Sequence, residues 1–279
     1  MLAGLTVLLA EDNATNQLVA VQMLEALGAE VEVASDGAEA LETLAAKRFD
    51  VLLIDIEMPQ VSGIEVIRRL RRPGSGHETV PMIALTAYVM HEHRRQIRAA
   101  GADGIIAKPI MSVERLGEEI LGFMAEAART RCGGATGAQG RPGTAVTAPS
   151  GGRAPARSAG AVSSGEGVVD DRVIDELADT VGATALRGVL ERAIEDIASA
   201  GADLEEALAL DDATRARRAS HVISGLAGVV GAERLGALAR AVHDASPPSD
   251  AGVRPQDAAR LVDATLRALE ARSRATLAS

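Results

Sequence analysis

Three carboxylates in the first half of the sequence stand directly after apolar runs. Glu11 and Asp12 follow residues 7–10, and Asp55 follows residues 51–54. If these runs are parallel strands, their carboxyl ends meet at one edge of the sheet, where open α/β folds bind ligands. Carboxylates that converge without an adjacent arginine need a cation, and Mg²⁺ is held by a few carboxylates, waters and substrate oxygens.

Thr86 and Lys108 stand at the same place in the pattern, after the apolar residues 82–85 and 104–107. Taken singly, each polar residue has an ordinary explanation, such as a helix cap, a strand threonine or a solvated lysine. Together they predict one polar rim that combines carboxylates, a hydroxyl and an ammonium group. Such a rim can bind Mg²⁺ and a phosphoryl group, because positive charge neutralises the oxygens of the transferred group.

The elements around this rim alternate between strand and helix. Most of the short runs are apolar throughout, which is typical of parallel strands covered on both faces. We expect strands at 7–10, 31–34, 51–54, 82–85 and 104–107, and helices near 14–27, 37–47, 64–72, 91–100 and 113–128. Residues 1–129 are thus predicted to form a doubly wound α/β domain with five parallel strands.

Residues 130–168 are rich in Gly, Ala, Ser and Pro, and we interpret them as a flexible linker. Residues 169–279 carry helical patterns only, and their short breaks predict an antiparallel bundle. The expected helices are 171–181, 184–209, 213–230, 232–245 and one near 255–275. Because of the linker, we expect the two folded parts to behave independently.

His221 differs from the other histidines. On a helix over 213–230 it points away from the apolar stripe and therefore into solvent. The stripe consists of Ala219, Ile223, Leu226 and Val230. Ser224, Gly225 and Gly228 lie on the same outer face as His221, and each helical glycine costs about 1 kcal/mol relative to alanine. The small residues predict a cleared surface on which another protein docks, with positive charge from Arg217 and Arg218 nearby.

The remaining four histidines are expected to be less informative. We predict that His77, His91 and His93 are solvated, and that His243 is a cation near a helix C-terminus. His221, and not His243, is therefore the candidate for chemistry.

Composition narrows the function classes. The net charge is −10, with two Phe, one Tyr and no Trp, so the chain is short of both the basic faces and the aromatic platforms that nucleic-acid binding uses. A single cysteine, Cys132, excludes a disulfide framework and fits a cytoplasmic protein. No apolar run approaches the ~20 residues of a membrane span.

Residues 3–128 resemble a response-regulator receiver domain, and residues 10–17 are most similar to the receivers of hybrid sensor kinases. The matching segments are Glu11-Asp12, Asp55-Ile56-Glu57-Met58-Pro59 with Gly63, Leu85-Thr86-Ala87 and Lys108-Pro109. The resemblance implies a flavodoxin-like fold in which Asp55 accepts the phosphoryl group. It also implies that Glu11, Asp12, Asp55 and the backbone carbonyl of Glu57 hold Mg²⁺, that Thr86 and Lys108 contact the phosphoryl oxygens, and that Lys108-Pro109 is cis. The aromatic residue that many receivers place three positions before the lysine is Ile105 here.

Residues 170–275 resemble a histidine-containing phosphotransfer (HPt) domain, a four-helix bundle with one phosphorylatable histidine, on the strength of segment 219–226 around His221. Ser224 stands where that family usually has a lysine. The two resemblances imply a phosphorelay protein, without a kinase domain of its own, that works with a sensor histidine kinase and with other receiver or HPt proteins. The alternative is a phosphorylation-switched receiver whose degenerate bundle only docks a partner. A DNA-binding output domain is disfavoured by the acidic charge of the bundle.

Overall fold

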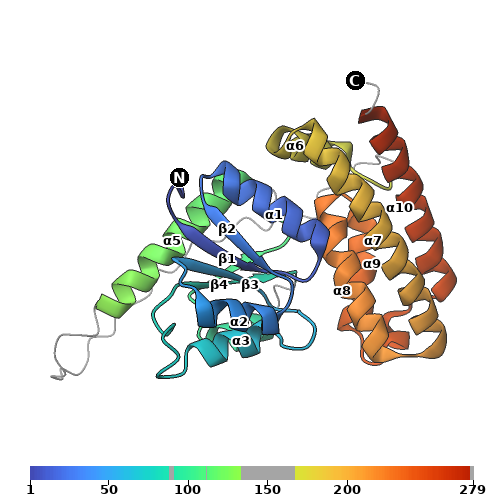
Figure 1. Cartoon of the computed structure of the whole chain (residues 1–279). Coiled ribbons are helices and arrows are strands. Elements are labelled where there is room, and N and C mark those ends of the chain that lie inside the picture. The colour runs from blue at the N-terminus through green and yellow to red at the C-terminus, as the bar shows by residue number, and fades with distance from the viewer. Residues whose placement is uncertain (88–90, 111, 133–166, 277–279) are drawn as a thin grey trace, which may run out of the picture.

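The computed structural model describes residues 1–87, 91–110, 112–132 and 167–276. Within these ranges the chain forms an α/β domain followed by a helical bundle, and the two lie side by side (Figure 1). Both fold classes were predicted from the sequence.

The α/β domain is built on five parallel strands in the order β2-β1-β3-β4-β5, which is the flavodoxin-like order. The strands are β1 (Thr6–Ala10), β2 (Glu30–Ala34), β3 (Val51–Asp55), β4 (Met82–Thr86) and β5 (Gly104–Ala107). Every residue of β3 and β4 is buried, which explains their continuous apolar runs. Each of the five predicted strands is confirmed to within one or two residues.

Helices cover both faces of this sheet. Apolar residues of α1 (Ala14–Ala26) and α5 (Val113–Cys132) pack in one core, and those of α2 (Gly37–Ala46), α3 (Gly63–Leu70) and α4 (His91–Ala100) pack in a second core on the other face. Side chains cap the helices that follow the rim loops. Asn13 accepts a hydrogen bond from the Asn16 backbone N–H at the start of α1, and Asp36 accepts two at the start of α2.

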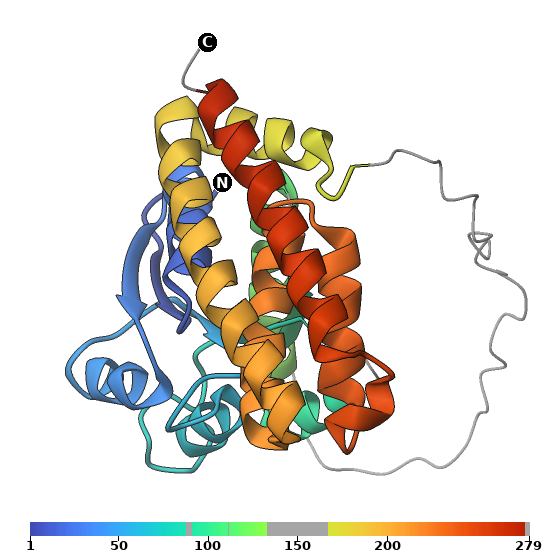
Figure 2. The same ribbon diagram turned by 90° about the vertical axis from the view of Figure 1, so that its right-hand side faces the viewer.

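The second half consists of α6 (Asp171–Val181), α7 (Ala183–Leu210), α8 (Ala213–Val229), α9 (Glu233–Asp244) and α10 (Pro255–Thr276), with a short 3₁₀ turn at Pro248–Ala251. Helices α7 to α10 pack against one another as a bundle, and α7 and α10 run side by side (Figure 2, gold and red). Helix α6 lies across one end of the bundle, next to α7 and α8. The predicted helices are therefore confirmed.

The predicted linker begins later than expected. Helix α5 continues to Cys132, so residues 130–132 belong to it. Residues 133–166 lie outside the described residues, and their flexibility stays a prediction.

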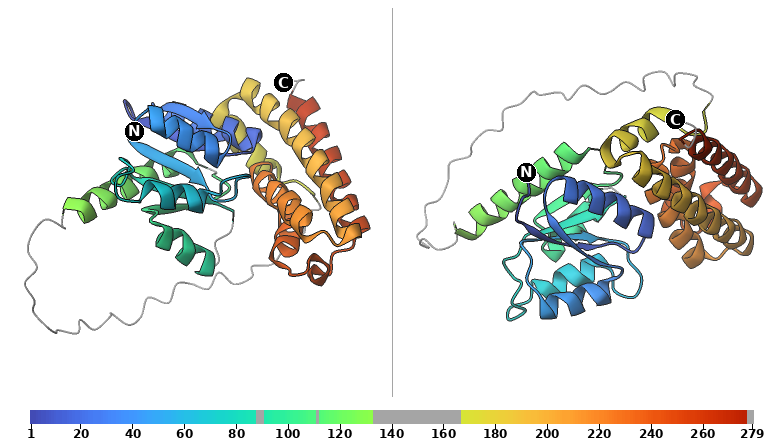
Figure 3. Two further views of the ribbon diagram at one scale, coloured as in Figure 1. Left: turned by 60° about the horizontal axis from the view of Figure 1, so that its bottom comes forward. Right: turned by 45° about the horizontal axis from the view of Figure 1, so that its top comes forward.

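The two halves are packed against each other, which differs from the independence expected at first. One apolar cluster runs from the receiver-like half into the bundle. Val19 and Met23 of α1 line a small apolar cavity together with Leu177 of α6 and Val229 of α8. Both views in Figure 3 show α1 lying beside the bundle. This contact brings the carboxyl edge of the sheet toward α8.

Candidate functional site

The carboxylate rim lies where the sequence predicts it, at the carboxyl ends of the strands. Asp55 ends β3 and is fully buried, and Glu11, directly after β1, is 2% exposed. The ammonium group of Lys108 lies between them. Its Nζ donates to Glu11 Oε2 at 2.5 Å and to Asp55 Oδ2 at 2.8 Å. Glu11, Asp55 and Lys108 are far apart in the sequence but form one charge network in the fold.

This network sets the protonation of its members. Burial alone would raise the pKa of Asp55, but the charge of Lys108, followed by His221, lowers it to about 2. Burial alone would lower the pKa of Lys108, but the charges of Asp55 and Glu11 outweigh burial and raise that pKa. Burial raises the pKa of Glu11. Asp55 is consequently a carboxylate at neutral pH and available as a nucleophile.

Thr86 and the Lys108-Pro109 pair complete the rim. Thr86 ends β4, is 1% exposed, and its backbone carbonyl accepts a hydrogen bond from the Lys108 backbone N–H at 2.8 Å. The peptide bond between Lys108 and Pro109 is cis, as the resemblance implies. Both side chains implied to contact phosphoryl oxygens are therefore placed beside Asp55 by adjacent strands.

Asp12 carries the signature of a cation site. A carboxylate oxygen of Asp12, one of Asp55 and a ring nitrogen of His221 lie within 4.8 Å of one another. Burial and the nearby charge of Asp55 raise the pKa of Asp12, so negative charge at this point is under-compensated. Carboxylate oxygens are the hard donors that Mg²⁺ prefers. The two carboxylates of this cluster therefore fit a magnesium ion, whereas the ring nitrogen of His221 is not a donor of that kind.

His221 lies in the middle of α8 and faces this rim. Its Nε2 is 3.7 Å from Asp55 Oδ2, and its Nδ1 is 2.7 Å from Glu57 Oε2. The predicted orientation is correct, since Ala219, Ile223 and Leu226 point into the bundle core. The predicted exposure is wrong, because the receiver half covers this face and leaves the His221 side chain 12% exposed.

The two acidic groups next to His221 control its charge. Burial would lower the pKa of His221, but its interactions with Asp55 and Glu57 outweigh burial and raise that pKa to about 10. In turn, His221 and then His243 lower the pKa of Glu57 against the effect of its burial. In this docked arrangement the imidazole is therefore a cation between two carboxylates.

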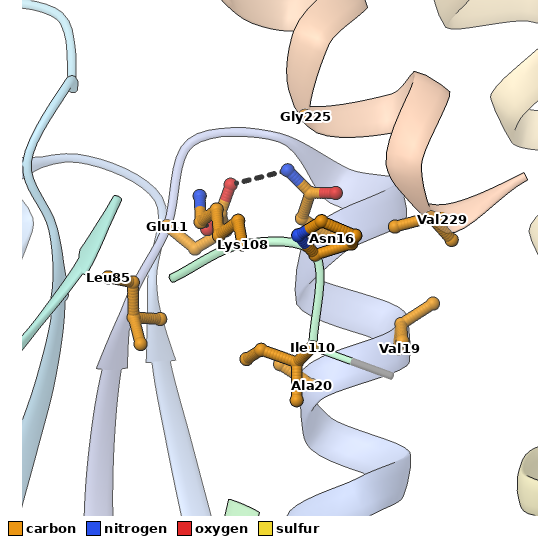
Figure 4. Close-up of a pocket in the computed structure, with 10 residues that line it drawn as sticks. Glu11, Asn16, Val19, Ala20, Leu85, Lys108, Ile110, Gly225 and Val229 are labelled. Atoms are coloured by element: carbon orange, nitrogen blue, oxygen red, sulfur yellow. Dashed lines mark hydrogen bonds and ion pairs between the residues drawn. The ribbon is translucent and has the colours of Figure 1, made fainter. Parts of the chain in front are cut away.

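The small residues of α8 do clear a docking surface, and the partner is the chain's own receiver half. Gly228 lies against the ring of Pro109, where an added Cβ would come within 2.5 Å of Cγ. Gly225 lies opposite Asn16 of α1 (Figure 4). Ser224 is also buried, with 4% exposure. The close approach of α8 to the rim depends on the two glycines lacking a side chain.

Two contacts in the site escaped the sequence reasoning. Asp196 of α7 accepts hydrogen bonds from Thr15 Oγ1 at 2.9 Å and from Asn13 Nδ2 at 3.2 Å, and these cross between the halves. His243 of α9 reaches the site with Nε2 3.5 Å from Glu57 Oε1. Asp196 has no local signal, because an acid on a helix surface is usually solvated. His243 could have been found only by knowing that α9 runs beside α8.

His77 contradicts its expected solvation. It is 4% exposed, and its Nε2 lies 2.7 Å from Arg48 Nη1 and 3.0 Å from the Leu44 carbonyl oxygen. Its loop folds back over the end of α2, where burial, together with Arg48, lowers the pKa of His77. Its contacts are with Arg48 and the end of α2, so we assign this histidine a structural role. His93, in the first turn of α4, is half-buried and not fully solvated as predicted, and the side chain of His91 lies outside the described residues.

Comparisons with known proteins agree with this geometry. The family model described as "Response regulator receiver domain" matches residues 7–120, and the one described as "Hpt domain" matches residues 188–274. The polar-differentiation response regulator DivK of Brucella anthropi is 36% identical over 122 residues, which cover 44% of this chain and 98% of DivK. The chain belongs to the response-regulator receiver family. Its second half carries an Hpt domain, so the chain combines the two domain types of phosphorelay signalling.

Two longer relatives match different shares of this chain. The sensory/regulatory protein RpfC of Xanthomonas campestris is 26% identical over 230 residues, which are 82% of this chain and 28% of RpfC. The aerobic respiration control sensor protein ArcB of Escherichia coli is 37% identical over 109 residues, or 39% of this chain and 14% of ArcB. The chain therefore spans well under a third of the length of these relatives.

Among solved structures, the receiver domain of sensor histidine kinase PA1611 from Pseudomonas aeruginosa, described with a magnesium ion in its active site cleft, is 33% identical. The match covers 44% of this chain and 99% of that structure, with a TM-score of 0.41. Within the part of the chain that the structure describes, no helix has the length and apolarity of a membrane span.

Proposed function

We propose that this chain is a two-site phosphorelay protein in which Asp55 and His221 of one molecule exchange a phosphoryl group. Asp55 takes the group from a separate sensor histidine kinase, and His221 connects the chain to other receiver or HPt proteins. One observation carries the proposal: His221 Nε2 lies 3.7 Å from Asp55 Oδ2. The nucleophile of one domain thus already faces the nucleophile of the other.

The rim residues divide the work of phosphoryl transfer. Transfer passes through a loose transition state that the protein stabilises mainly by positioning and charge. Mg²⁺, held by Glu11, Asp12, Asp55 and the Glu57 carbonyl, would neutralise phosphoryl oxygens when bound. Lys108 would move from its two carboxylates to a phosphoryl oxygen, and Thr86 would donate its hydroxyl proton to another.

The bundle compensates for its departure from the HPt pattern. Ser224 replaces the usual lysine, and its side chain is buried. Arg217 and Arg218 line an open cavity beside His221, together with Asp12 and Glu57. They would supply positive charge near the transferred group in place of that lysine.

The receiver half also departs from its family pattern at Ile105, which pairs with Ala84 of β4 and packs partly buried against the core of α2, α3 and α4. Switching by an aromatic side chain is unavailable at this position. The proposed output is therefore the docked bundle itself, which senses the charge on Asp55 directly.

The alternative function is a docking module with an inert His221. The same geometry that carries the relay argues against it, because a bundle used only for docking has no need to place imidazole nitrogen within 4 Å of the acceptor carboxylate. The net acidic composition and the scarcity of aromatic residues leave nucleic acid as an unsuitable partner. The proposed location is the cytoplasm, where sensor kinases present their phosphoryl groups.

The test uses the purified full chain with Mg²⁺ and a small-molecule phosphodonor. Wild type is expected to acquire base-labile acyl phosphate and acid-labile phosphohistidine. Asp55→Asn should acquire neither, and His221→Gln only the acyl phosphate. Mixing the two variants, at a series of dilutions, separates exchange within a chain from exchange between chains. A wild type that carries acyl phosphate alone would favour the docking module, and acid-labile phosphate on His221→Gln would show that the wrong histidine was chosen.

A further inference from the structure

Glu57 of the receiver half contacts the Nδ1 atom of His221, the ring nitrogen that faces away from Asp55. Glu57 Oε2 lies 2.7 Å from His221 Nδ1, while Nε2 of the same ring lies 3.7 Å from Asp55 Oδ2. Asp55 ends β3, and Glu57 follows it by two residues. The end of this strand and the residues directly after it therefore contact both nitrogens of a histidine supplied by the other domain.

The Glu57 carboxylate is itself held in place by the bundle. Its second oxygen, Oε1, lies 3.5 Å from Nε2 of His243 on α9. The Glu57 side chain is 24% exposed and those of His221 and His243 are 12% and 18% exposed, so these contacts are largely shielded from water. Each oxygen of Glu57 thus faces one histidine, and the orientation of the carboxylate is determined.

The chemistry of transfer requires a particular protonation of the ring. In the unphosphorylated docked chain the ring is a cation, so the proton on Nε2 must first leave to water. Nε2 then presents its lone pair to phosphorus while the remaining proton stays on Nδ1, and a hydrogen bond from Nδ1–H to a carboxylate selects that tautomer. As the new N–P bond forms, the O–P bond to Asp55 breaks and its electron pair returns to the Asp55 carboxylate. The ring then carries a positive charge with the proton still on Nδ1, and Glu57 lies where it neutralises that charge. The reverse transfer follows the same course.

We propose that Glu57 is a positioning residue for the phosphotransfer between Asp55 and His221, an inference that rests on the proposed function. The receiver supplies it in trans to the bundle, and His243 holds it. Glu57 fixes the imidazole so that only Nε2 meets the phosphoryl group. Asp55 carries the phosphoryl group, and Glu57 orients the His221 ring that exchanges it.

The contrasting explanation is that Glu57 only helps the halves to associate. Asp196 provides a matched control, because it also hydrogen-bonds across the interface, to Asn13 and Thr15, without touching the imidazole. Loss of either carboxylate weakens docking, but only loss of Glu57 frees Nδ1. A measurement that reports which ring nitrogen is phosphorylated separates the two roles.

The experiment follows single-turnover transfer in the full chain, in wild type, Glu57→Ala, Glu57→Gln and Asp196→Ala. Asp55 is phosphorylated with Mg²⁺ and a small-molecule phosphodonor. Formation of phosphohistidine is normalised to the acyl phosphate present in each chain, and the loss of acyl phosphate by hydrolysis is measured in the matching His221→Gln backgrounds. Phosphorus NMR identifies the phosphohistidine isomer.

We expect Glu57→Ala to slow normalised transfer about 10- to 100-fold, by analogy with the loss of a carboxylate that orients a metal-binding histidine, and to yield both isomers. Glu57→Gln should restore the single Nε2 isomer and part of the rate, because its amide oxygen still accepts from Nδ1–H. Asp196→Ala should keep one isomer. Transfer by Glu57→Ala at the wild-type rate with one isomer would overturn the inference alone. No phosphohistidine in wild type would overturn the proposed function and the inference with it.

Discussion

Gly228 of α8 packs directly against Pro109, the residue after the rim lysine. An added Cβ at Gly228 would lie 2.5 Å from Pro109 Cγ and 2.8 Å from Cδ, whereas one at Gly225 would meet only Asn16 Nδ2, at 3.2 Å. The contact between the halves therefore leaves no room for a side chain at Gly228. At Gly225, one turn earlier, a methyl group would need only a small shift of Asn16.

Gly228→Ala should separate the halves while making the bundle itself more stable. The methyl group collides with a rigid proline ring, yet alanine in a helix interior is about 1 kcal/mol better than glycine. Small-angle scattering should show a more extended molecule, and thermal unfolding should show a bundle at least as stable. Gly225→Ala is the matched control and should stay compact. An equally compact Gly228→Ala chain would contradict the interface.

Asp196→Ala should weaken the contact between the halves. The change removes Asp196 Oδ2, the one acceptor of the hydrogen bonds from Thr15 Oγ1 and Asn13 Nδ2. Each hydrogen bond is worth about 0.5–1.5 kcal/mol, or more because the acceptor is ionised. Amide exchange at the start of α1 and along α8 should become faster. Asp203→Ala, which removes an ion pair with Arg215 inside the bundle, is the control and should leave α1 unaffected.

Removal of Mg²⁺ should prevent phosphorylation of Asp55.

The effect of Asp12→Asn on the melting temperature should depend on Mg²⁺. Without Mg²⁺, Asp12→Asn relieves the like-charge repulsion that raises the pKa of Asp12, and the melting temperature should rise. With Mg²⁺, wild type should gain melting temperature, whereas the variant should gain much less because it has lost a ligand. Equal gains in both chains would show that Asp12 does not hold the ion.

His77 should make the receiver half sensitive to mild acid. Burial and Arg48 lower the pKa of His77 below 6.5, so the folded state resists its protonation. The stabilisation from neutral His77 is fully present above pH 6.5. The free energy of unfolding then falls as the pH decreases from 6.5 toward the lowered pKa of His77 in the folded state. Denaturant titrations from pH 7.5 to 5 should show this loss in wild type and less of it in His77→Gln. Parallel curves would contradict the assignment.

Residue types and periodicity were enough to predict the elements of each half and the edge of the sheet at which the polar residues meet. The continuous apolar runs that end in Glu11, Asp55 and Lys108 identify buried parallel strands, because strands covered on both faces must be apolar throughout. The helical period places His221 opposite the bundle stripe. These properties depend on neighbours within a few residues or on the common direction of parallel strands, and local sequence encodes both.

Only the tertiary structure decided what His221 faces. The approach of α8 to the rim joins positions about 165 residues apart in number, with residues 133–166 between the halves, so no local period reports it. The contacts of Glu57, Asp196 and His243, like the burial of His77, arise from surfaces that meet after folding. A charged residue on a helix or loop has the same sequence signal whether water or a partner surface covers it, and packing alone tells the two apart.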